Sequence, residues 1–298
     1  MTNRREFIQL AACGVAAATL NHSFAADPKL PKLKKAVKYG MVGGKGTPKE
    51  KFELLKKLNF QGVEIDSPSG LKLDELLAAK DATGIQIHGV VDSVHWNDTL
   101  SHPDEKVRAK GLAGLRTAIK DAKIVGADTA LLVPGVVNKT VSFEQCWERS
   151  TAEVKKALEN AEKAGVKIAI EVVWNDFITK PEQLVEYVDQ FKSPWVGAYF
   201  DCSNMLRYGV PAATWIRKLG KRMLKFDFKG YSASKATPDN MYAGFKVGIG
   251  EGDEDWPEVL KACAEVGYNS WATAEVGGGD EKWLADVSTR MDKILGLK

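Results

Sequence analysis

The sequence predicts an α/β protein built as a single (β/α)₈ barrel. First, short apolar runs of strand length alternate with amphipathic segments of helix length. Second, there are eight such runs, each followed by a helical segment, which implies parallel pairing with right-handed crossovers. A count of eight favours a closed barrel over an open doubly wound sheet. Third, a glycine stands where a helix gives way to the next strand, a place that suits a left-handed residue: Gly84, Gly126, Gly165 and Gly267.

The expected strands are the short apolar runs. In chain order they span residues 37–42, 62–66, 85–91, 129–134, 166–172, 196–201, 223–229 and 270–276. The expected helices have apolar residues at helical spacing. In the same order they span residues 49–58, 73–82, 104–125, 142–164, 181–191, 212–219, 256–266 and 281–295. The barrel is therefore expected to occupy residues 37–298, behind a polar linker at residues 26–36.

Residues 1–25 resemble a twin-arginine signal peptide. Arg4 and Arg5 precede a weakly apolar, uncharged run at residues 8–20, which is too short to span a bilayer. Ser-Phe-Ala at residues 23–25 fits a small-x-small cleavage site. We therefore expect export to the periplasm, with no membrane association after cleavage.

A lipoprotein box at residues 10–13 is the less favoured alternative for the same segment. Few apolar residues precede Cys13, so the segment is short for the hydrophobic part of a lipoprotein signal. The exported chain would keep three scattered cysteines, which we expect to be free thiols: Cys146, Cys202 and Cys263.

Composition excludes several classes of function. The 42 basic and 39 acidic residues are interspersed and leave a net charge of +3, so the chain lacks the basic stripe of a nucleic-acid-binding protein. The glycines of residues 40–46 lack the G-x-G-x-x-G spacing that follows the first strand of a dinucleotide-binding fold. A nucleotide cofactor is therefore not expected.

Four of the expected strands end in an acidic residue, and they are consecutive strands. Carboxyl ends of barrel strands meet at one mouth, where the active sites of such barrels lie. Four carboxylates gathered there repel one another by several kcal/mol per pair at reduced dielectric, on the order expected from Coulomb's law, unless a cation lies among them. Any one of them alone could be a helix cap or part of a surface ion pair. Together they predict a site for a divalent cation: Glu171, Asp201, Asp227 and Glu275.

The alternation in the seventh strand adds a second indication. A period of two places Lys225, Asp227 and Lys229 on the face that points into the barrel. Such a row is costly in a plain core and common in a functional site. We expect Lys225 to form a salt bridge at the bottom of the barrel and Lys229 to lie near the mouth. The apolar residues of the other face are expected to pack against the helices: Leu224, Phe226 and Phe228.

Four segments resemble the xylose-isomerase-like TIM barrel superfamily, and within it the sugar phosphate isomerase/epimerase group. They are Glu-Val-Val-Trp-Asn at 171–175, Phe-Asp-Cys-Ser-Asn at 200–204, Glu-Gly-Asp-Glu-Asp-Trp at 251–256 and Trp-Ala-Thr-Ala-Glu at 271–275. The resemblance covers residues 37–295 and implies one divalent metal bound by Glu, Asp, His and Glu. In this chain Glu171, Asp201 and Glu275 match three of these ligands, and Asp227 stands in place of the histidine. The resulting all-oxygen set favours Mn²⁺ or Mg²⁺, with Lys229 offsetting part of the negative charge.

The resemblance also implies the chemistry. The reaction would be a sugar isomerisation or epimerisation that moves a proton next to a carbonyl through an enediolate, with Glu171 and Glu275 as base and acid. A lyase or dehydratase acting on a 3-keto-glycoside or inosose would use the same site, because the enolate intermediate is shared. A third alternative is an exported sugar-binding protein without catalysis. An endonuclease-IV-like metal cluster would need more histidines than the three that follow residue 25.

The expected ligand is a small sugar or keto-sugar, and the chain is compatible with a homo-oligomer. An unphosphorylated sugar is preferred, since no helix start rich in Gly and Ser offers a phosphate site. Each residue expected to bind substrate also has a plain structural interpretation, as a core histidine, a packed tryptophan, a helix cap or a hydrogen-bonding partner of a ligand. These residues are His88, Trp96, Trp174, Asn175, Lys229 and Glu64.

Overall fold

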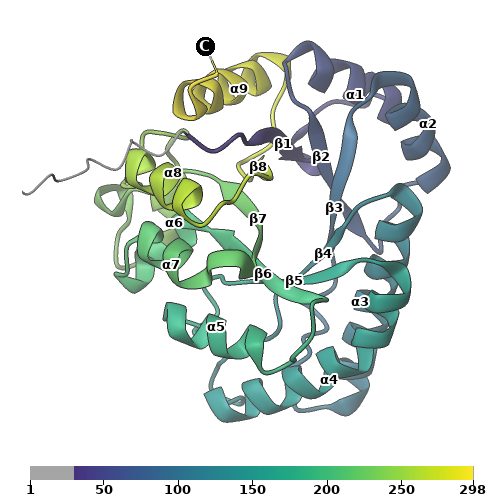
Figure 1. Cartoon of the computed structure of the whole chain (residues 1–298), viewed down its shortest axis with the longest axis vertical. Helices are drawn as coiled ribbons and strands as arrows, with labels where there is room; N and C mark the ends of the chain where they lie inside the picture. The colour runs from purple at the N-terminus through teal and green to yellow at the C-terminus, as the bar shows by residue number, and fades with distance from the viewer. Residues whose placement is uncertain (1–29, 298) are drawn as a thin grey trace, which may run out of the picture.

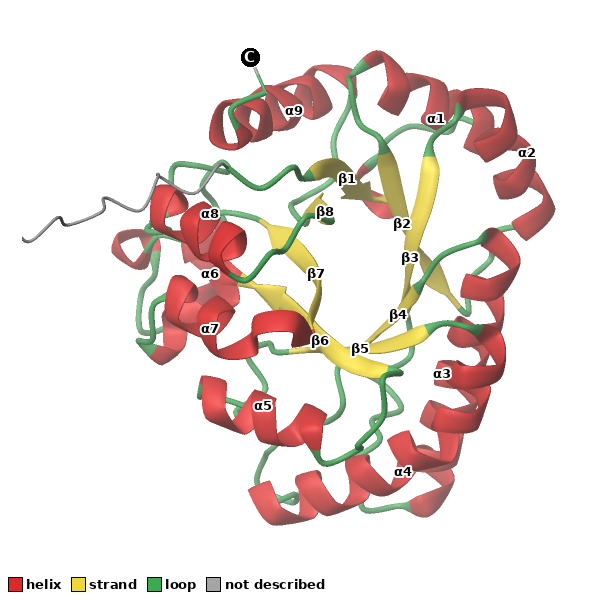
Figure 2. Cartoon of the chain, in the orientation of Figure 1, coloured by secondary structure: helices red, strands yellow, loops and turns green. Residues whose placement is uncertain are grey.

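The computed structural model describes residues 30–297. Its eight strands are all parallel and close into a barrel in the order β1 to β8, and helices surround the strands (Figures 1 and 2). The predicted (β/α)₈ fold is therefore confirmed. The expected signal peptide, with its arginine pair and Cys13, lies outside the described residues. Within the described part of the chain, no helix is long and apolar enough to cross a bilayer.

From β2 onward, the strands lie within or close to the apolar runs of the sequence. They are β1 Lys34–Lys38, β2 Gly62–Ser67, β3 Gln86–Asp92, β4 Thr129–Leu132, β5 Lys167–Glu171, β6 Val196–Asp201, β7 Met223–Phe228 and β8 Trp271–Ala274. The helices are α1 Pro48–Lys57, α2 Leu73–Thr83, α3 Glu105–Val125, α4 Phe143–Ala164, α5 Pro181–Asp189, α6 Cys202–Met205, α7 Ala212–Leu219, α8 Trp256–Glu265 and α9 Glu281–Leu295.

The expected first strand was wrong in its position. Strand β1 begins at Lys34, inside the segment expected to be a linker, and a 3₁₀ turn, Tyr39–Met41, follows it. This strand begins with two lysines, Lys34 and Lys35, so it does not form an apolar run in the sequence. The side chain of Lys35 is buried and pairs with Asp292 on α9 at 2.5 Å. The backbone N–H of Lys34 donates to the carbonyl of Ser270 and starts the pairing with β8.

Helix ends follow the local signals of the sequence. Thr47 and Ser142 form capping boxes at the starts of α1 and α4, and each satisfies backbone N–H groups that a helix start leaves free. Three of the expected glycines, Gly84, Gly126 and Gly165, end helices in the left-handed conformation with φ of 80°, 78° and 69°. These local choices set where each helix stops and the next strand begins.

The main apolar core lies between the strands and the surrounding helices. Phe226 and Phe228 of β7 belong to it, as expected. Leu224 does not: the pairing of β7 with β6 skips this residue, and Leu224 packs instead against a small second cluster formed by Leu131, Ala169 and Tyr199. One extra residue in a strand breaks its alternation locally.

The barrel interior has polar layers. Lys225 is buried and forms an ion pair of 2.6 Å with Asp128, which confirms the salt bridge expected for this lysine. Cys202, Cys146 and Cys263 are buried free thiols, as expected. Burial raises the pKa of the Cys202 thiol far above its ordinary value, so this cysteine is a core residue and not a nucleophile.

Candidate functional site

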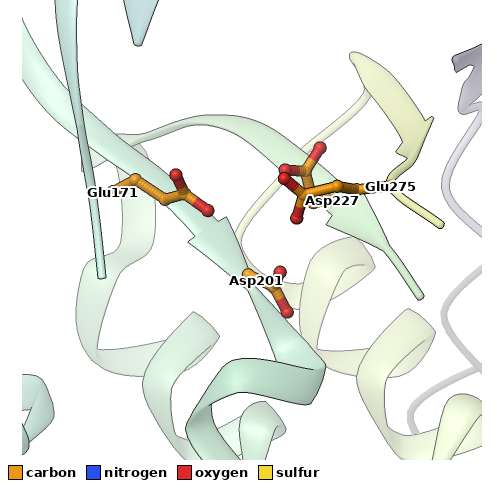
Figure 3. A group of neighbouring side chains, drawn as sticks. All are labelled: Glu171, Asp201, Asp227 and Glu275. Atoms are coloured by element: carbon orange, nitrogen blue, oxygen red, sulfur yellow. The ribbon is translucent and has the colours of Figure 1, made fainter. Parts of the chain in front are cut away.

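Four carboxylates meet where β5, β6, β7 and β8 end. Figure 3 shows Glu171, Asp201, Asp227 and Glu275 grouped near one another on these neighbouring strands and the residues that follow them. One carboxylate oxygen from each residue lies within 4.8 Å of the others. Three of the side chains are buried, and that of Glu275 is 36% exposed. The structure thus brings together all four residues that the sequence singled out as metal ligands.

The register of the sheet explains the meeting. Asp201 pairs directly with Asp227 across β6 and β7, and Asp227 pairs with Thr273 of β8, two residues before Glu275. Asp201 is also the N-cap of α6, where its Oδ1 accepts hydrogen bonds from the N–H groups of Ser203 (2.8 Å) and Asn204 (2.9 Å). The cap fixes the orientation of this carboxylate.

Lys229 joins two of the acids. Its Nζ lies 2.7 Å from Asp201 Oδ2 and 2.6 Å from Glu275 Oε2. Burial alone would lower the pKa of Lys229, but the charges of Asp201, Glu275 and Glu171 outweigh it and raise the pKa well above the ordinary value. The lysine is therefore a permanent cation in the cluster.

A second lysine was missed by the sequence. Lys38, the last residue of β1, contacts Glu64 and lies 3.1 Å from Asp227 Oδ2. The hydroxyl of Tyr199 lies between the same two acids, 3.1 Å from Glu64 Oε2 and 2.9 Å from Asp227 Oδ1. The expected strand at 37–42 placed Lys38 near its beginning, whereas the real strand ends there, at the mouth.

Neighbouring charges shift the pKa values of the two acids expected to be catalytic in opposite directions. Burial raises the pKa of Glu171 well above its ordinary value, and the neighbouring Glu275 and Asp227 raise it further. Burial would also raise the pKa of Glu275, but Lys229 and Lys38 outweigh it and lower the pKa to about 2. Burial is the largest cause of the raised pKa values of Asp201 and Asp227 as well. Protein groups alone thus favour a proton on Glu171 and a charge on Glu275.

A cavity of about 530 Å³ opens at the cluster. Glu171, Glu275, Lys38 and Lys229 line it together with an aromatic group from two loops. In this group the ring of Trp174 lies 4.9 Å from that of Tyr242 and 5.0 Å from that of Phe245. The remaining lining residues are Asp66, Val91, Ser93, His95, Trp96, Leu131, Val173 and Asn204.

Three of the residues expected to bind substrate line this cavity: Trp96, Trp174 and Lys229. The indole N–H of Trp174 donates to the carbonyl of Asn204 at 2.8 Å, which fixes the ring, whereas Trp96 is 50% exposed. Tryptophan faces of this kind suit the apolar face of a sugar ring.

The other three expected substrate residues lie elsewhere. His88 stacks on Trp271 with ring centroids 4.6 Å apart, and its Nε2 lies 3.2 Å from Thr273 Oγ1. Burial lowers its pKa well below the ordinary value, so His88 is a neutral core histidine. The amide of Asn175 donates to the carbonyl of Gly135 at 2.7 Å and supports a loop. Glu64 is paired with Lys38.

Two aromatic residues of the cavity were not anticipated from the sequence. Tyr242 and Phe245 belong to a 3₁₀ turn, Met241–Phe245, in the connection between β7 and α8. The length of this connection, residues 229–255, could have indicated that it contributes to the site, because long connections in compact domains are usually functional.

Comparisons with known proteins agree with this fold. L-ribulose-5-phosphate 3-epimerase UlaE of Escherichia coli O1:K1 is 28% identical over 231 residues, covering 74% of this chain and 78% of the relative. The structure of D-psicose 3-epimerase from Clostridium cellulolyticum H10, determined with D-tagatose, superposes with a TM-score of 0.71 at 23% identity, covering 88% of this chain and 98% of that one. The structure of the IolI protein with a bound zinc atom superposes with a TM-score of 0.73 at 18% identity, covering 89% and 99%.

A family model described as the xylose isomerase-like TIM barrel matches residues 52–293, most of the described barrel. The match includes every residue of the acidic cluster and extends from α1 into α9. The chain belongs to the xylose isomerase-like TIM barrel family.

Proposed function

We propose that this protein is a sugar isomerase or epimerase that moves a proton next to a carbonyl group with the help of a divalent cation. The observation that carries the proposal is that Glu171 and Glu275 line one cavity and belong to a cluster of four carboxylates whose oxygens lie within 4.8 Å of one another. Two carboxyl groups placed in one cavity can act as acid and base, and in the metal-free protein their pKa values are shifted in opposite directions. The 28% identical relative is a sugar epimerase by name, which supports the reaction class.

The proton transfer can be assigned to residues. Glu275 is ionised and is the base that removes the proton from the carbon next to the carbonyl. Glu171 carries a proton and donates it to the substrate. Transfer to the opposite face of the carbon gives epimerisation, and transfer to the neighbouring carbon gives isomerisation.

The donor set fits a divalent cation. Five acids, Glu64 and the four of the cluster, face two lysines, Lys38 and Lys229, so the acids outnumber the lysines by three when all five are ionised, as they would be around a cation. The buried Asp201 Oδ2 and Asp227 Oδ2 accept no hydrogen bond and have only ion-pair contacts with these lysines. Oxygen ligands favour Mn²⁺ or Mg²⁺ over Zn²⁺. When bound, the cation would hold the carbonyl and hydroxyl oxygens of the sugar and stabilise the enediolate charge.

We further propose that the sugar is unphosphorylated. Among the described residues, the lysines that line the cavity, Lys38 and Lys229, are both paired with carboxylates, and none of the lining side chains is an arginine. A phosphate would meet acids without a free cation to bind it. Burial lowers the pKa of His95 to about 4, so this histidine adds no positive charge at neutral pH.

Solvent exchange tests the reaction. The protein is incubated in D₂O with ketoses and 3-keto-glycosides, with and without Mn²⁺, and deuterium at carbon is followed by NMR. We expect exchange that requires Mn²⁺ and is lost in Glu171→Gln and Glu275→Gln. The matched control is Glu186→Gln, an exposed glutamate on α5, which should exchange at the wild-type rate.

The same experiment separates the alternatives. Release of a leaving group from a 3-keto-glycoside would identify a lyase, which shares the enolate intermediate. Tight sugar binding without any exchange would identify a binding protein and contradict the proposed reaction.

We also propose that the chain is exported to the periplasm after cleavage behind residue 25, on the strength of its N-terminal sequence. Cell fractionation, with and without Arg4→Lys/Arg5→Lys, tests this. Retention of the double variant in the cytoplasm would support the proposal, and periplasmic recovery of both proteins would contradict the twin-arginine route.

A further inference from the structure

A buried network beside the acidic cluster is not explained by proton transfer. It joins four strands: Lys38 of β1, Glu64 of β2, Tyr199 of β6 and Asp227 of β7. The side chain of Lys38 is 15% exposed, and those of Glu64 and Asp227 are inaccessible to solvent. A lysine held at this depth costs free energy unless its charge is compensated.

Lys38 lies against three protein oxygens. Its Nζ contacts Glu64 Oε2, lies 3.1 Å from Asp227 Oδ2 and lies 3.4 Å from the hydroxyl of Tyr199. The contact with Asp227 is an ion pair, and it places the charge of Lys38 directly beside a member of the acidic cluster.

Among the contacts of Lys38, Asp227 is the member of the acidic cluster, and both of its carboxylate oxygens have a partner. Its Oδ1 accepts a hydrogen bond from the Tyr199 hydroxyl at 2.9 Å, and its Oδ2 lies against Lys38. A carboxylate oxygen has two lone pairs, so each oxygen can keep its present partner and still face a cation. A carboxylate on a short side chain can rotate about its last bond, and two anchors remove that freedom.

We infer that Lys38, together with Tyr199, is a positioning residue that holds the Asp227 carboxylate in the orientation in which it binds the divalent cation. The inference rests on the proposed function, because it assumes a cation among the four acids. Lys38 also contacts Glu64, whose negative charge it offsets. Of the two acids beside Lys38, Asp227 is therefore the one that is proposed to bind the cation. Groups that orient metal ligands typically contribute about 10- to 100-fold to metal affinity.

Mn²⁺ affinity of the full chain, measured by calorimetry and by electron paramagnetic resonance, tests the inference. The double variant Lys38→Met/Glu64→Gln removes one positive and one negative charge, so the net charge stays constant while the anchor on Asp227 is lost. We expect Mn²⁺ binding to weaken about 10- to 100-fold. Tyr199→Phe removes the other anchor without any change of charge and should weaken binding in the same direction.

Lys225→Met is the matched control. Lys225 is a second buried lysine of the barrel interior, paired with Asp128 and hydrogen-bonded to the carbonyl of His88, without contact to the acidic cluster. Its loss should lower thermal stability and leave Mn²⁺ affinity unchanged.

The outcomes are distinguishable. Wild-type Mn²⁺ affinity in the folded double variant would overturn the inference and leave the proposed function standing. If circular dichroism shows that the double variant does not fold, the affinity of Tyr199→Phe decides instead. Absence of Mn²⁺ binding in the wild-type protein would overturn the proposed metal site and the inference together.

Discussion

At the scale of single residues, the site depends on how two lysines are distributed among five acids. Lys229 lies against Glu275 and Asp201, and Lys38 lies against Glu64 and Asp227. Glu171 has no lysine in contact in the described structure, so burial and its acidic neighbours dominate its pKa. The pKa values of two chemically similar side chains are thus shifted in opposite directions by the different charges beside them.

The two groups should titrate far apart in the metal-free protein. Burial and its acidic neighbours raise the pKa of Glu171, whereas Lys229 and Lys38 lower that of Glu275 to about 2. We therefore expect NMR titration of the side-chain carboxyl carbons, without added metal, to show Glu171 still protonated above the ordinary glutamate pKa and Glu275 ionised throughout. Addition of Mn²⁺ should remove the proton from Glu171, because a nearby cation favours the charged form. A metal-free protein in which Glu171 ionises at or below the ordinary glutamate pKa would contradict this account of its surroundings.

At the scale of elements, the connection between β7 and α8 completes the cavity by carrying Tyr242 and Phe245. Glu254 ties this connection to α6. Its Oε1 accepts a hydrogen bond from the hydroxyl of Ser203 at 2.6 Å and another from the N–H of Tyr231 at 2.7 Å. Its other oxygen is buried without a partner, and burial raises the pKa of Glu254 to about 7.

Glu254 should make stability depend on pH. The folded protein holds this proton up to about pH 7, whereas the unfolded chain loses it near the ordinary glutamate pKa. The folded state therefore binds more protons between these values, and its stability falls as pH rises through them. Glu254→Gln keeps an acceptor oxygen and removes the buried charge. We expect its melting temperature to exceed that of wild type by about 2–4 °C at pH 8, the shift for roughly 1 kcal/mol in a chain of this size.

Scanning calorimetry at pH 5 and pH 8 measures this difference. The gain should vanish at pH 5, where the glutamate of the folded wild type is already protonated. A lower melting temperature for Glu254→Gln at both pH values would show that the carboxylate, and not its acid form, stabilises the connection.

At the scale of the whole molecule, the barrel is closed by contacts between its first and last elements. Strand β1 pairs with β8, and α9 lies beside α1 and β1 (Figure 1). The buried Lys35 of β1 pairs with Asp292 of α9 at 2.5 Å and donates to Ser288 Oγ at 2.7 Å. An exposed ion pair of 2.6 Å between Lys57 and Glu281 joins α1 to α9.

Removing one partner of the buried pair should loosen this closure. We expect Lys35→Met to lower the free energy of unfolding by about 3–5 kcal/mol, because the buried Asp292 loses the charge of Lys35. The double variant Lys35→Met/Asp292→Leu should recover much of the loss, since two apolar side chains can replace a buried ion pair. Urea unfolding measures both effects. If Lys35→Met has the same free energy of unfolding as wild type, the closure of the barrel does not depend on this ion pair.

The sequence predicts this molecule best where apolar pattern and fold agree. Strand β6 was predicted to the residue, and the alternation of β7 correctly placed Asp227 and Lys229 on the interior face. Prediction failed at β1, where Lys34 and Lys35 lie in a strand because distant elements compensate them. No local pattern contains that information.

The same reason limits prediction of the site. Acids at strand ends are a repeated pattern and therefore visible in the sequence, but Lys38 is a single residue whose role depends on partners from three other strands. His88 shows the converse: a histidine in a strand of the barrel interior suggests a ligand, yet its stacking on Trp271 makes it part of the core.

The most direct test of the account is anomalous diffraction from a crystal of the protein soaked in Mn²⁺. We predict a single strong peak per chain among the carboxylate oxygens of Glu171, Asp201, Asp227 and Glu275. If no peak appears at the cluster, or if Mn²⁺ binds only elsewhere on the chain, the claim that these acids hold the cation is contradicted.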